Sequence, residues 1–184
     1  MNQTFRGKHF PQTITREGFT ITARIERDDH ADAPWDAEDG HGPVSAWLDK
    51  RCKRPGQMIL HEDRGRARFY DFEEAVKIAK RDGWDAPPFG EGTAGERADR
   101  AVRADFERLR RWCADEWCYV AVVLAVSRNG VTLDEWAASL WGIESDAGEY
   151  LSEVANDLIE ESLQVAHAAV SDFVSRLTTI NTEN

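Results

Sequence analysis

Apolar and polar residues alternate with a period of two near the N-terminus. Between residues 19 and 26, FTITARIE, every second side chain is apolar. This period is typical of a β-strand with one buried face. Residues 12–16, QTITR, form a second short stretch, and Glu17-Gly18 between the two is a turn signal. The pattern predicts a β-hairpin, and QMILHED followed by RGRARFYD, residues 57–71, predicts another.

The most hydrophobic run of the chain extends from Trp117 to Val126 and is rich in valine. It has no polar face, which is typical of a central strand covered on both sides. Asn129-Gly130 follows the run and is a turn signal. We expect the partner strand over residues 137–141, with Gly142 ending it.

Three helices are predicted, each from a capping signal followed by apolar residues at helical spacing. In a capping box, an acidic or hydroxyl side chain at the helix start is followed by a glutamate three residues later. The first helix is expected to end near Gly83. The second has a core-facing stripe, and Asp105 is assigned to its solvated outer face. The three boxes are Asp71 with Glu74, Thr93 with Glu96, and Asp146 with Glu149.

The last helix is predicted to run from Asp146 to about Leu177 and to have three faces. One apolar stripe is expected on the sheet, and an acidic ridge lies opposite it. The ridge has no lysine or arginine at i,i+4 spacing, so its like charges oppose folding slightly. A second apolar stripe packs either on the same domain or on another molecule. We assign Asp146, Glu149, Glu153, Asp157, Glu160 and Glu161 to partner binding, and Ile159, Leu163, Val170 and Val174 to an oligomer contact.

Together these elements predict an α+β fold in a single domain over residues 1–184. The expected architecture is an antiparallel or mixed sheet of five to six strands covered by three helices, including the long C-terminal helix. Residues 12–163 are assigned to the globular core, and residues 164–184 to the helix end and tail. A chain of 184 residues is long enough for one well-buried core.

The net charge of −11 is concentrated in the last third of the chain. Residues 129–184 contain 11 acidic residues and one basic residue, Arg176, whereas residues 1–128 contain 23 acidic and 22 basic residues. Direct binding of duplex nucleic acid through the acidic third is disfavoured, because phosphate contacts need cations. The basic surface of a protein partner is the expected counterpart.

No residue pattern predicts a catalytic site, a cofactor or a resident metal. The acidic loop over residues 28–41, together with His61, is the basis of one alternative, since clustered carboxylates bind hard cations. Cys52, Cys113 and Cys118 have neither metal nor redox spacing, so we expect reduced thiols in a cytoplasm. The longest apolar run, Cys118 to Val126, is too short to span a membrane.

Three segments carry a resemblance to a known group of proteins. They are RFYDFEEAV, the stretch from Ala98 to Val123, and SLWGIESD followed by Y-L-x-E-V-A up to Ala155. Over residues 56–162 the chain is similar to small accessory proteins encoded in phage and prophage genomes. The resemblance implies a phage gene product that acts in the cytoplasm of a bacterial host, and it brings no catalytic residue with it.

The leading hypothesis is an acidic, non-enzymatic interaction protein. It would bind and inhibit a nucleic-acid-handling host complex, as an anti-CRISPR or antirestriction protein does, partly by imitating DNA charge. One alternative is a metal-dependent enzyme or factor that uses the 28–41 loop. Another is a structural phage protein that forms a homodimer or a larger oligomer.

Overall fold

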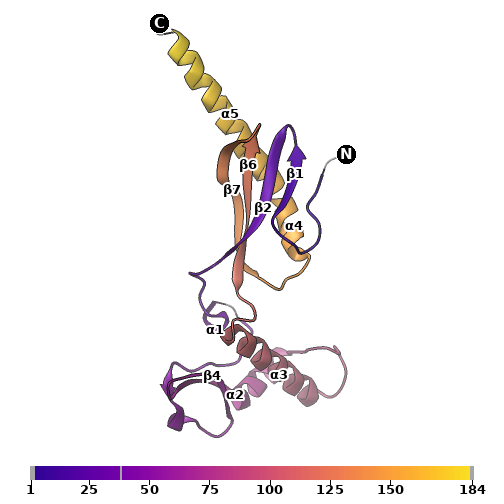
Figure 1. Ribbon diagram of the computed structural model, residues 1–184. Coiled ribbons are helices and arrows are strands. Elements are labelled where there is room, and N and C mark those ends of the chain that lie inside the picture. The colour runs from indigo at the N-terminus through magenta and orange to yellow at the C-terminus, as the bar shows by residue number, and fades with distance from the viewer. Residues whose placement is uncertain (1–2, 38, 183–184) are drawn as a thin grey trace. The chain divides into compact units, whose positions relative to one another are not determined.

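The computed structural model describes residues 3–37 and 39–182, with the backbone alone for residues 179–182 (Figure 1). The chain forms two compact units, one from residues 1–30 with 118–184 and the other from residues 31–117. Helices and strands occur in both units, which confirms the α+β class. The predicted assignment of residues 1–184 to a single domain, with a core over 12–163 and a tail over 164–184, stays a prediction.

The single sheet of five to six strands is corrected by the structure. The described strands form a four-stranded sheet in the first unit and a three-stranded sheet in the second. Strand periodicity shows which face of a strand is buried, but it does not show which strand is the neighbour. The strands of each sheet pair only among themselves, so seven strands replace the expected five or six.

The first unit contains an antiparallel sheet in the order β1-β2-β6-β7. The predicted N-terminal hairpin is confirmed: Glu17 and Gly18 have φ of 54° and 78°, as a type I′ turn requires. The predicted central strand is β6, which is buried on both faces over residues 119–124. The strands are β1 (Gln12–Arg16), β2 (Phe19–Arg27), β6 (Tyr119–Arg128) and β7 (Val131–Glu144).

β7 is longer than the sequence predicted. It begins directly after the Asn129-Gly130 turn and continues past Gly142, so the expected bounds of 137–141 are wrong. Gly142 has φ of 76° and lies where the register between β6 and β7 shifts. The glycine therefore marks a β-bulge inside the strand, and the strand resumes beyond it.

The last predicted helix is divided into α4 (Tyr150–Asp157) and α5 (Ile159–Thr182), with a break at Leu158. The predicted capping box of Asp146 with Glu149 is wrong. Glu149 is itself the N-cap residue, and no side chain caps the helix there. The turn over residues 145–149, with Gly148 at φ of 66°, brings the helix start three residues later than the box requires.

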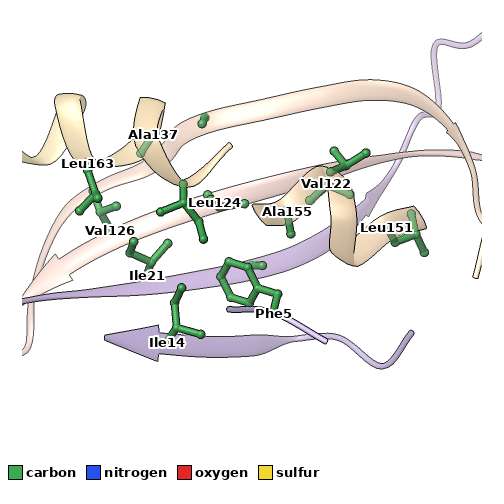
Figure 2. Close-up of a cluster of buried hydrophobic side chains, with 14 of the residues drawn as sticks. Phe5, Ile14, Ile21, Val122, Leu124, Val126, Ala137, Leu151, Ala155 and Leu163 are labelled. Carbon is green, nitrogen blue, oxygen red and sulfur yellow. The ribbon is translucent and has the colours of Figure 1, made fainter. Parts of the chain in front are cut away.

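Both helices pack on one face of the four-stranded sheet. Because of the break at Leu158, the first half of α5 faces the same core as α4. The N-terminal segment adds Phe5 to this core, held by a 2.9 Å hydrogen bond from its backbone N–H to Asn156 Oδ1. Figure 2 shows the core side chains Phe5, Ile14, Ile21, Val122, Leu124, Val126, Leu151, Ala155 and Leu163 gathered between sheet and helices.

The second unit has a sheet in the order β3-β5-β4 with two longer helices. The predicted hairpin is confirmed, with Arg64 and Gly65 at φ of 47° and 82°. Thr93 and Glu96 form the complete predicted capping box, and Gly83 ends the preceding helix in the left-handed region. The elements are α1 (Pro34–Ala37), β3 (Leu48–Asp49), η1 (Lys50–Cys52), β4 (Gln57–Asp63), β5 (Arg66–Asp71), α2 (Phe72–Asp82) and α3 (Ala94–Cys113).

The position of Leu124 at the centre of the first core gives a test of this fold. We expect Leu124→Ala to lower the free energy of unfolding by about 2–5 kcal/mol, because a fully buried side chain leaves a cavity. Val131→Ala, at the exposed start of β7, is the matched control and should change it by about 0.5 kcal/mol or less. Urea denaturation measures both, and equal effects would contradict the assigned core.

Candidate functional site

The six acidic residues assigned to partner binding are all exposed, and they lie along α4, the start of α5 and the preceding turn. Glu160 is paired with Arg16 of β1 at 2.7 Å. Within the described chain, no basic side chain lies within ion-pair distance of Glu149, Glu153, Asp157 or Glu161. The structure therefore shows each of the predicted acids at the surface, and we call the set the acidic ridge: Asp146, Glu149, Glu153, Asp157, Glu160 and Glu161.

The break at Leu158 changes the energetics of this ridge. It creates a second helix N-terminus, where the partial positive charge of the helix dipole stabilises acids. Glu153 lies in the first turn of α4, and Glu160 and Glu161 lie in the first turn of α5. Asp157 is the exception, because it ends α4, where the dipole opposes a negative charge. Asp157 also lies two residues before the start of α5, so the two helix ends act on its charge in opposite directions.

A hollow of about 300 Å³ lies beside the ridge. Glu149 and Glu153 line it from α4, and the N-terminal segment lines it with Arg6 and Gly7. This segment is fixed in place, because the Ser152 hydroxyl donates to the Gly7 carbonyl and Asn156 donates to the Phe5 carbonyl. The ridge is thus a shaped polar surface, and its hollow is large enough for a single side chain.

The four residues assigned to an oligomer contact differ in burial. Ile159 and Leu163 are buried in the core of their own unit, because the helix break turns them toward the sheet. Val170 packs on the edge of the same core, and Val174 is exposed. Beyond Val170, exposed apolar side chains continue at Phe173 and Leu177.

The 28–41 loop does not form a ligand cluster. In the described parts of the chain, which exclude Glu38 of this loop, no three His, Cys, Asp or Glu side chains are arranged to hold a metal ion. His61 instead packs against Trp47, with ring centroids 5.0 Å apart. His41, at the end of the loop, contacts Asp105 of α3. The metal-dependent alternative gains no support from this geometry.

Asp105 is the centre of a buried polar cluster in the second unit. Its carboxylate accepts hydrogen bonds from the Tyr70 hydroxyl at 2.6 Å and the Gly42 backbone N–H at 2.8 Å, and His41 Nδ1 lies 2.6 Å from it. Only 9% of the Asp105 side chain is exposed, so its assignment to a solvated face is wrong. Asp105 lies three residues after Val102 and four before Leu109 in the buried stripe, a spacing that could have indicated its position.

The cluster depends on close approach of the loop to β5. A Cβ at Gly42 would overlap the Tyr70 hydroxyl and lie 2.7 Å from Ala75 Cβ, so only glycine fits. Burial, followed by the nearby Asp105 charge, raises the pKa of the Tyr70 hydroxyl and keeps it a hydrogen-bond donor. An open cavity of about 320 Å³ adjoins the cluster, lined by Gly40, Trp84, Asp85, Ala101 and Asp105. Because each Asp105 oxygen already has a partner, we interpret the cluster as a clamp that holds the loop.

Among the helices that the structure describes, none is long and apolar enough to cross a membrane. Comparisons with protein-family models, with curated proteins and with solved structures found no match to this chain.

The clamp can be tested by Asp105→Asn. An amide cannot accept from all three donors, so we expect the free energy of unfolding to fall by about 1–3 kcal/mol. Asp99→Asn on the same helix removes a surface ion pair with Arg103 and should cost about 1 kcal/mol or less. Thermal denaturation compares the two. If the Asp105 variant is no less stable than the Asp99 variant, Asp105 is not a clamp.

Proposed function

We propose that this chain is an interaction protein whose acidic ridge binds a basic surface of a protein partner. The observation that carries the proposal is the exposure of all six ridge acids, of which Glu149, Glu153, Asp157 and Glu161 have no ion pair in the described chain. A basic partner surface would supply the missing counter-charges.

The partner that we propose is a nucleic-acid-handling complex of a bacterial host. Such complexes have basic surfaces that contact phosphates, and a row of fixed carboxylates can occupy these surfaces. The resemblance of residues 56–162 to accessory proteins of phages supports this choice, because inhibition of host restriction or CRISPR complexes benefits a phage. The chain would then act as an inhibitor by partly imitating DNA.

Neutralisation of the ridge tests the proposal. The variant Glu149→Gln, Glu153→Gln, Asp157→Asn and Glu161→Gln removes four charges that have no ion pair in the described structure. We expect the Kd for a captured host complex to rise by about tenfold or more, equivalent to about 1.4 kcal/mol. Binding of the unmodified chain should also weaken between about 50 and 200 mM salt. Capture from a bacterial lysate followed by direct binding to the purified complex measures both.

The matched control changes the same net charge in the other unit. Glu62→Gln, Asp63→Asn, Glu73→Gln and Glu116→Gln are all at exposed positions and should leave the Kd unchanged. If both variants weaken binding equally, net charge and not the ridge governs the interaction. A ridge variant that binds and inhibits the complex like the unmodified chain would refute the proposal.

A second candidate function is self-association through the end of α5, and a specific observation favours it. In Figure 1, α5 continues past the end of the four-stranded sheet. Val170, Phe173, Val174 and Leu177 share one side of this part of the helix, and Phe173 is 64% exposed. This spacing is typical of a seam between two helices. A homodimer would cover it.

Analytical ultracentrifugation tests the homodimer. We expect the unmodified chain to sediment as a dimer at high concentration and Phe173→Glu as a monomer, because a buried charge in the seam is unfavourable. Ser175→Glu adds the same charge on another side of the helix and should leave the dimer intact. An unmodified chain that stays monomeric would contradict self-association.

A further inference from the structure

Two tryptophans of β7, Trp136 and Trp141, lie on the same face of the four-stranded sheet, although their positions differ by five. In a regular strand, residues an odd number apart point to opposite faces. Here a step of two residues along β6, from Leu124 to Val126, is matched by a step of four along β7, from Ala138 to Asp134, so the strand bulges. Ala137 and Ala138 both point into the core. The bulge thereby places Trp136 on the outer face together with Trp141.

The outer face is the one opposite α4 and α5. Ile21 and Ala23 of β2 are in the core, so Arg24, next along the strand, is directed outward. The Arg24 guanidinium lies 4.7 Å from the ring centroid of Trp136. The rings of Trp136 and Trp141 are nearly parallel, at 7°, with centroids 6.2 Å apart. Arg24, Trp136 and Trp141 thus form a continuous stack, the arginine–tryptophan stack.

Hydrogen bonds to neighbouring residues hold the stack in place. Arg24 Nε donates to Glu26 Oε1 at 2.7 Å, and Arg24 Nη1 donates to the Glu135 carbonyl at 2.8 Å. The Asp134 carboxylate accepts from the Trp136 backbone N–H at 2.7 Å and so fixes the bulge. Ordered aromatic side chains bind ligands at a low entropic cost, because few rotamers are lost.

The tryptophans remain accessible despite this packing. Trp136 is 51% exposed and Trp141 is 46% exposed. A contiguous apolar patch on an otherwise charged surface marks an interaction site more often than scattered exposed residues do. Trp136 lies between the Arg24 guanidinium and Trp141, and Trp141 ends the stack in the described structure.

The charges around the stack indicate the chemistry of its ligand. Asp134 and Glu135 of β7 precede Trp136, and β7 contains no lysine or arginine. Glu26 borders the stack from β2, and its carboxylate is paired with Arg24. A phosphate-bearing ligand would be repelled by this surface, so single-stranded nucleic acid is disfavoured although it stacks on aromatic rings. A cationic planar group fits both the rings and the charges.

We propose that the outer face of β7 binds an arginine-bearing segment of a protein partner, with a partner guanidinium stacked on Trp141. The partner's guanidinium continues the stack that Arg24 begins at Trp136. This site lies on the opposite side of the sheet from the acidic ridge, and it does not rest on the function proposed for the ridge. A protein could use both surfaces, but each has its own ligand chemistry.

The test uses the full chain with the ridge already neutralised by the four substitutions given above, so that the ridge cannot bind the probe. The probe is a short peptide of alternating arginine and glycine, and the same peptide with lysine is its control. The indole N–H resonances of Trp136 and Trp141, assigned by substitution, report binding in NMR titrations. We expect both resonances to shift, with a Kd about fivefold or more lower for arginine than for lysine.

Substitutions at the stack complete the test. Trp141→Ala should raise the Kd for the arginine peptide about tenfold or more, whereas Trp141→Phe should retain part of the binding. Phe89→Ala, at an exposed aromatic residue of the other unit, should leave it unchanged. Equal Kd values for the two peptides would overturn the proposal. So would shifts of the two indoles caused by oligo-dT, or by raising the protein concentration without peptide.

Discussion

The first unit depends on β6 being buried on both faces. Its inward side chains, among them Val122 and Leu124, form the core with α4 and α5, and its outward Ala121 and Val123 are equally inaccessible to solvent. A strand buried on both sides needs cover on both sides. The two helices supply it on one face. Among the described residues of this unit, no helix covers the other face, and the large side chains of the neighbouring strands, including Arg24, take that role.

The two faces of the four-stranded sheet differ in chemistry because helices cover one face and side chains alone cover the other. Helices cover a sheet with their apolar stripe and leave a polar surface outward, so acids gather along α4 and α5. Side chains that cover a sheet face by themselves must be large and also remain in contact with water. Tryptophan and arginine meet both requirements, because each has a broad apolar surface and a polar end. One strand thus leads to an acidic surface on one side and an aromatic surface on the other.

Local signals predicted much of this structure, and the failures have a common cause. The hairpins at Glu17-Gly18 and Arg64-Gly65 and the capping box at Thr93 depend on a few adjacent residues, and all three formed as expected. The division into two sheets depends on pairing between distant strands, which periodicity does not encode. The break at Leu158 interrupts the helical repeat of apolar residues, and the bulge before Ala138 interrupts the strand alternation. No glycine or proline lies at either position to indicate the interruption.

These two interruptions are also where both proposed surfaces arise. Without the bulge, Trp136 and Trp141 would point to opposite faces, and one indole would have to fit into a core that now holds two alanines there. Without the break at Leu158, the ridge would have one helix N-terminus in place of two. Its acids would then lie in the middle of a continuous helix, where no helix dipole would offset their mutual repulsion. Regular elements build the cores of this protein, and departures from regularity determine which side chains its surface presents to a partner.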